Sequence, residues 1–110
     1  MRFFRADRVS SVIREELGKL LTRELEFPGA IVTITEVEAD KKLDRAAVYV
    51  SVFPSEKAPE IMRILGEATP RLQHLLLRKM NIKPMPRIEF RHDIGPERAA
   101  GVEKALLEDK

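Results

Sequence analysis

The side chains best suited to chemistry in this sequence are lysines and arginines that gather in two groups. Six of them lie between positions 71 and 91, where Glu89 is the single acidic residue. Lysine and arginine neutralise phosphate groups and donate hydrogen bonds to their oxygens. Both groups therefore indicate a phosphate-binding surface, and the alternative for each is ordinary charge in weak surface ion pairs. The second group consists of Arg2, Arg5, Arg8, Lys19 and Arg23, on or before the first expected helix.

No combination of residue types indicates catalysis or a metal centre. The two histidines, His74 and His92, fall on different expected elements, and there is no cysteine to complete a zinc site or act as a nucleophile. The serines lack the flanking glycines of a nucleophile elbow, and the five glycines form no phosphate-cradling loop. We therefore expect no enzymatic activity, no cofactor, no metal and no small-molecule substrate.

The composition favours one small globular domain. The chain has 110 residues, of which 44% are apolar, enough for a single core. Its 20 lysines and arginines nearly balance 18 aspartates and glutamates, so a nucleic-acid surface requires segregation of charge onto one face. No apolar run reaches the roughly 18 residues that span a bilayer, and the first residues do not read as a signal peptide. We expect a cytoplasmic monomer without a membrane partner.

The hydrophobic pattern predicts a helix followed by a hairpin. Apolar residues recur at helical spacing over residues 9–25, and a Pro-Gly pair follows. β-Branched residues then mark a strand at 30–39, where a one-residue slip in the apolar alternation predicts a bulge. A short polar link and a second alternating run at 46–53 complete an antiparallel hairpin.

A proline within the next apolar helical pattern predicts an interruption. Pro59 suits the first turn of a helix, and Pro70 interrupts that helix. We expect a break or kink at Ala68 and Thr69, with Thr69 as the N-cap of a helix that restarts at Pro70. The exposed N–H groups of a helix start attract phosphate, so Ala68, Thr69 and Arg71 join the candidate phosphate-binding surface.

The remaining segments predict a third strand and an optional last helix. Asn81 is expected to close the preceding helix in a left-handed conformation. Residues 87–93 alternate as a half-exposed strand, and residues 97–107 could form a short helix before a frayed end. The order is thus helix, strand, strand, helix, kink, helix, strand. Three strands cannot bury both faces, so we expect an α+β two-layer sandwich with the helices packed on one face of a three-stranded sheet.

Several segments, in this order and spacing, resemble the ribosome-binding factor A family over nearly the whole chain. Arg8 and Val9 open the first expected helix, and the run RELEFP closes it at 23–28. The hairpin contains TITEVE at 33–38, DKKL at 40–43 and AAVYVS at 46–51, and the last strand contains PRIEFRHD at 86–93. The resemblance implies a type II KH-like RNA-binding domain in residues 1–94, followed by a short helix or frayed tail at 95–110.

The resemblance also implies a function and a form for the kink. Members of this family bind the immature small (30S) ribosomal subunit and its 16S rRNA, aid late maturation and 5′-end processing, are associated with cold adaptation and have no catalytic activity. Their kink has the form Ala-x-Gly and replaces the usual KH glycine loop. Ala68 matches this form, whereas Pro70 stands at the glycine position, which keeps the interruption but loses glycine's conformational freedom.

Sparse aromatic residues favour recognition of folded RNA through its backbone and shape over stacking on single-stranded bases. We expect most of the basic residues between positions 71 and 91 to collect where the helix after the kink meets the third strand. The alternative function is a protein-interaction module whose basic faces meet acidic partners without direct RNA contact. The candidate RNA-binding residues are Arg5, Arg8, Ala68, Thr69, Arg71, Arg78, Lys79, Lys83, Arg87 and Arg91.

Overall fold

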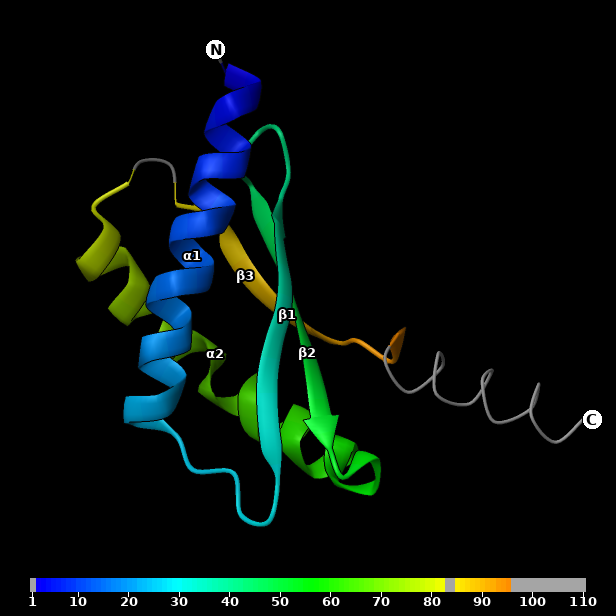
Figure 1. Cartoon of the computed structure of the whole chain (residues 1–110). Coiled ribbons are helices and arrows are strands. Elements are labelled where there is room, and N and C mark those ends of the chain that lie inside the picture. The colour runs from blue at the N-terminus through cyan, green and yellow to red at the C-terminus, as the bar shows by residue number, and fades with distance from the viewer. Residues whose placement is uncertain (1, 83–84, 96–110) are drawn as a thin grey trace, which may run out of the picture.

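A three-stranded sheet carries the helices on one of its faces (Figure 1). The structure is a computed structural model that describes residues 2–82 and 85–95. The elements of this described part are α1 (Arg2–Glu24), β1 (Ile31–Ala39), β2 (Arg45–Phe53), a 3₁₀ turn (Ser55–Lys57), α2 (Ala58–Met80) and β3 (Arg87–His92). The expected α+β two-layer sandwich is confirmed. Lys83 and the predicted helix at 97–107 lie outside the described residues.

Strand β2 lies between the other two strands. It pairs antiparallel with β1, as the predicted hairpin requires, and parallel with β3. A parallel pair needs a crossover connection, which α2 provides between β2 and β3. The register of β1 and β2 shifts between Ile34 and Glu36, so Thr35 is the extra residue of the predicted bulge. Thr35 Oγ1 donates a hydrogen bond of 2.7 Å to Asp93 Oδ2 just beyond β3, and the bulge thereby links the two edge strands.

Alternation along β2 separates a buried face of the sheet from an open one. Every second residue of β2 is buried under the helix layer, and α1 contributes a matching apolar stripe. Each fully buried Val, Ile or Leu side chain contributes about 1.5–3 kcal/mol. α1 begins at Arg2 and not at residue 9, because Ala6 extends the buried stripe by a turn. The buried side chains of these two elements are Ala6, Val9, Ile13, Leu17, Leu20 and Leu21 in α1 and Ala46, Val48, Val50 and Val52 in β2.

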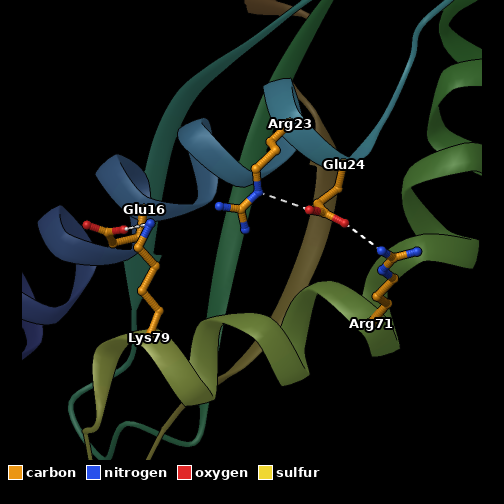
Figure 2. A network of polar contacts seen from close by, with 5 residues as sticks. All are labelled: Glu16, Arg23, Glu24, Arg71 and Lys79. Carbon is orange, nitrogen blue, oxygen red and sulfur yellow. Dashed lines mark hydrogen bonds and ion pairs between the residues drawn. The ribbon is translucent and has the colours of Figure 1, made fainter.

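Helix α2 is continuous across the predicted break. It contains Pro70 in its interior, so the two helices expected from the sequence are one element. Proline lacks the N–H that would bond to the Gly66 carbonyl, and Thr69 Oγ1 donates a hydrogen bond of 2.7 Å to the Leu65 carbonyl one turn back. Such back-bonding bends helices, and Figure 2 shows α2 changing direction beside Arg71. The interruption is a bend within one helix and does not create a new helix start.

The end of α2 positions the third strand. Asn81 adopts φ 50° and ψ 42° and closes the helix, which confirms the predicted left-handed cap. Gln73 reaches from α2 to the edge of β3, where Nε2 donates to the Pro86 carbonyl at 2.9 Å and Oε1 accepts from the Ile88 N–H at 2.8 Å. In the described part of the chain, neither α1 nor α2 combines the length and apolar character needed to cross a bilayer.

Candidate nucleic-acid interface

The C-terminal end of α1 is joined to α2 by a carboxylate that binds one cation from each helix (Figure 2). Glu24 Oε1 lies 2.6 Å from Arg71 Nη2 of α2, and Glu24 Oε2 lies 3.0 Å from Arg23 Nε of α1. The two oxygens of one side chain are therefore divided between the two helices. Charge-assisted contacts of this length are the strong class of hydrogen bond.

A second carboxylate repeats the arrangement about two turns earlier in α1. Glu16 Oε2 lies 2.9 Å from Lys79 Nζ of α2, and Glu16 Oε1 lies 3.6 Å from Lys19 Nζ of α1. The close contact with the Lys79 ammonium, and then the charges of Lys19 and Lys79, hold the pKa of Glu16 below its ordinary value, while partial burial acts in the opposite direction. Lys19 also lies 3.7 Å from the exposed Glu15. The helix seam, as we name it, consists of Glu16, Lys19, Arg23, Glu24, Arg71 and Lys79.

The helix seam has its carboxylates beneath its cations. The Glu16 and Glu24 side chains are only 18% and 16% exposed, whereas those of Lys79 and Arg71 are 39% and 72% exposed. An approaching phosphate therefore meets ammonium and guanidinium groups first. This layering suits the seam to binding the backbone of a nucleic acid.

Arg5 and Arg8 extend the basic surface toward the start of α1. Both are exposed, and they line a pocket against Asn81 and Ile82, which follow the last turn of α2. A helix C-terminus carries partial negative charge, so arginines placed there also stabilise α2. Arg78, in that last turn, is exposed as well. Five of the predicted RNA-binding residues thus belong to the helix layer and are exposed: Arg5, Arg8, Arg71, Arg78 and Lys79.

Ala68 and Thr69 do not form the exposed helix start that the sequence suggested. Both lie inside α2 and are half-buried, with Ala68 packed against the core. The Thr69 hydroxyl donates back to Leu65 and does not cap a new helix. The prediction of an anion site at a new helix N-terminus was therefore wrong, because α2 bends at this point and does not break. Contact of Ala68 and Thr69 with RNA stays a prediction.

Arg87 and Arg91 lie on the opposite side of the molecule from the helix seam. They pair in register with Arg45 and Tyr49 of β2, whose side chains alternate with the buried ones. We name this surface the open sheet face. Glu89 bridges two of its arginines, with Oε1 3.6 Å from Arg45 Nη1 and Oε2 3.4 Å from Arg91 Nη2. The sheet separates these cations from those of α2, so the expectation that they would share one surface was wrong.

The open sheet face has mixed charge. The pocket on it brings acidic and basic side chains together in equal number, which weakens its attraction for phosphate. The charged residues lining this pocket are Glu38, Asp40, Lys41, Arg45, Glu89 and Arg91.

Sequence reasoning missed the residues that hold the candidate surface in place. Glu16 and Glu24 lie in a charged stretch of α1 where neighbouring glutamates have the same appearance in sequence. Gln73 gives no signal, because its two hydrogen-bond partners are backbone groups at and just before the start of β3, which lies at a distance in sequence. In residues 2–82 and 85–95, no group of three or more His, Asp and Glu side chains is placed to hold a metal ion.

Comparison with known sequences points to one family. Residues 5–106 match the family described as Ribosome-binding factor A. The protein of that name from Akkermansia muciniphila is 32% identical over 105 residues, covering 96% of this chain and 83% of that protein. The one from Pelodictyon phaeoclathratiforme is 34% identical over 105 residues, covering 93% of this chain and 88% of that protein.

Solved structures lead to the same family. One is the Thermus thermophilus ribosome binding factor A, fitted as a homology model into the cryo-EM map of a 30S–RbfA complex. It superposes with a TM-score of 0.64 at 28% identity, covering 76% of this chain and 90% of that one. A crystal structure of ribosome-binding factor A from Thermus thermophilus superposes with a TM-score of 0.65 at 24% identity, covering 79% of this chain and 94% of that one, and supports the shared fold.

Proposed function

The chain belongs to the ribosome-binding factor A family, and from this premise we propose that it is an assembly factor of the small ribosomal subunit. In this role it binds the immature 30S subunit through 16S rRNA and aids late maturation and 5′-end processing. Its fold is the α+β, KH-like sandwich of that family. The proposal rests most directly on the structural similarity to a relative that was fitted into a 30S complex. This similarity covers 90% of that relative.

The chemistry of the helix layer supports contact with RNA phosphates. Arg71 and Lys79 lie at its surface above Glu24 and Glu16, and Arg5 and Arg8 continue the row at the other end of α1. Phosphate contacts position a protein without selecting a sequence, so the shape of the folded rRNA supplies the specificity. The main proposed contacts are Arg5, Arg8, Ala68, Thr69, Arg71, Arg78 and Lys79 of the helix layer. Arg87 and Arg91 of the open sheet face, and Lys83, are proposed as weaker, peripheral contacts.

In the proposed function, the protein acts by binding alone. We propose that it has no catalytic activity and requires no cofactor. We also propose that residues 1–94 form the KH-like RNA-binding domain and that residues 95–110 form a short C-terminal helix or frayed tail. A protein that matures ribosomal subunits works where they assemble, so we place it in the cytoplasm, as a monomer.

Binding to rRNA and to ribosomal proteins can be distinguished directly. The full chain is titrated against purified immature 30S subunits and, separately, against protein-free folded 16S rRNA at the same salt concentration. We expect binding to both, with affinity that falls as salt rises. Binding to subunits with none to 16S rRNA would favour the protein-interaction module instead, and binding to neither would refute the proposed function.

Cryo-electron microscopy of the full chain on immature subunits identifies the contact surface. We expect the helix layer to face rRNA and the open sheet face to be turned more toward solvent. If the open sheet face lies on rRNA and the helix seam is exposed in the complex, our proposal places the interface on the wrong side of the protein.

A further inference from the structure

We propose that Glu16 and Glu24 are positioning residues for RNA binding: they hold Lys79 and Arg71 of α2 beside the cations of α1 before RNA arrives. The inference rests on the proposed RNA-binding function of the helix layer. It assigns a binding role to two acidic residues, which a reading of charge alone would count as unfavourable for RNA.

The geometry separates these two carboxylates from ordinary surface partners. Each gives one oxygen to a cation of α2, at 2.6 Å for Glu24 to Arg71 and 2.9 Å for Glu16 to Lys79. The pairs join residues far apart in sequence. Arg63 and Glu67, by comparison, form a pair one turn apart in α2 with side chains 61% and 68% exposed. That pair links two residues of one helix and does not join α2 to another element.

The two bridges repeat with one spacing on both helices. Glu16 and Glu24 are eight residues apart in α1, and Arg71 and Lys79 are eight residues apart in α2. At 1.5 Å per residue, each pair spans about 12 Å along its helix. The helices run in opposite directions at this contact, so Glu24 meets Arg71 while Glu16 meets Lys79. The two cations are therefore held at a defined separation along the seam.

The ion pairs of the seam lower the entropic cost of binding RNA, because they order long side chains in advance. Free lysine and arginine side chains lose rotamer freedom when they contact a phosphate. The ion pairs restrict those rotamers in the unbound protein, while the exposed parts of both cations still face solvent. Part of the ordering cost is thus met before RNA binds, as in other preorganised sites.

Replacing both glutamates separates positioning from simple charge. In the double variant Glu16→Gln and Glu24→Gln the protein gains positive charge, so electrostatic attraction alone predicts tighter RNA binding. Loss of positioning predicts weaker binding, about tenfold for two side chains. The matched control, Glu60→Gln with Glu67→Gln, makes the same change of charge at exposed positions outside the seam. Its affinity should equal or exceed that of the wild type.

The measurement is the dissociation constant for immature 30S subunits at fixed salt, below the unfolding temperature of every variant. A second double variant, Glu16→Asp and Glu24→Asp, keeps the charge and withdraws the carboxylates by one methylene. We expect it to bind about threefold more weakly than the wild type. A purely structural role would lower the melting temperature and leave both dissociation constants unchanged. Unchanged or tighter binding by the Gln pair, at the level of its control, would overturn the inference.

A measurement on the wild-type chain keeps the inference testable if the variants do not fold. ¹⁵N relaxation of the side-chain Nε of Arg71 in the free protein should show slower and more restricted motion than that of Arg14, an exposed arginine of α1. Equal mobility of the two would overturn the inference. Absence of any binding by the wild type would instead overturn the proposed function and would leave this mobility difference intact.

Discussion

The helix seam and the open sheet face contain the same local motif in different settings. In both, one carboxylate lies between two cations. At the seam the distances from Glu24 are 2.6 and 3.0 Å and its side chain is 16% exposed. On the sheet the distances from Glu89 are 3.4 and 3.6 Å and its side chain is 36% exposed. The seam is the tighter and the more enclosed of the two.

The elements beneath explain why this difference has consequences. Arg45, Glu89 and Arg91 stand on neighbouring strands whose backbones are already joined by a hydrogen-bond ladder. Their side chains follow from that register and add little to it. No such ladder joins α1 and α2, so the side chains of the seam decide how their charges are spaced. A bridge between separately placed elements can preorganise a binding surface, whereas a bridge within a ladder mainly neutralises charge.

RNA binding should give the largest contrast between the two regions. We expect the double variant Arg71→Ala and Lys79→Ala to bind 30S subunits about 30-fold more weakly, with a salt slope reduced by roughly two units, since each lost phosphate contact removes about one. The corresponding sheet variant, Arg45→Ala with Arg91→Ala, removes the same charge and should lose less than about threefold. Titrations at several salt concentrations measure both quantities. Equal losses would mean that the two faces contribute alike to binding.

Stability should depend strongly on the contact that fastens the two layers together. Replacing Gln73 by Ala leaves the Ile88 N–H and the Pro86 carbonyl without the partners that the side chain supplies. Unsatisfied groups of this kind cost about 1–3 kcal/mol. Urea denaturation should show that loss for Gln73→Ala and less than about 0.5 kcal/mol for the exposed neighbour His74→Ala. Similar values for the two variants would contradict a special role of Gln73.

Double-mutant cycles should show a smaller difference between the two bridges. We expect a coupling free energy of about 0.5–1 kcal/mol between Glu24 and Arg71, and below about 0.3 kcal/mol between Glu89 and Arg91, because exposed ion pairs are screened by solvent. Chemical denaturation of the single and double alanine variants measures both. A larger coupling on the sheet would reverse our ranking of the two regions.

The smallest effect should be on the pH dependence of stability, to which one carboxylate in the helix layer and one beside the sheet contribute. The pKa of Glu16 is held down by Lys79, and that of Asp93 by hydrogen bonds from Thr35 and from the Gly95 N–H. A carboxylate whose pKa is lower in the folded than in the unfolded state stabilises the fold above about pH 4. That stabilisation is lost as the pH falls through the lowered pKa. Glu16→Gln and Asp93→Asn should each reduce the fall in melting temperature between about pH 7 and pH 3. Unchanged pH profiles would remove these carboxylates as contributors.

The elements could be predicted well because their signals are local. The alternation of Ala46, Val48, Val50 and Val52 marks a strand wherever it lies in space, and the slip after Ile34 already indicated the bulge. Pro70 predicted the interruption of α2 but not its form. Whether a proline breaks a helix or bends it depends on what the flanking turns pack against. Here buried residues on both sides of Pro70 keep α2 in one piece, while the Thr69 hydroxyl bond accompanies the bend.

The candidate site divides in the same way. The sequence alone determined that basic residues are concentrated in two groups, that catalytic and metal-binding patterns are lacking, and which family the chain resembles. Only the tertiary structure decided that Arg91 and Arg71 lie on opposite faces and that Glu16 and Glu24 lie under the cations of α2. The reason is physical. Periodicity assigns a residue to a face of its own helix or strand, but the distance between faces of different elements depends on how those elements pack.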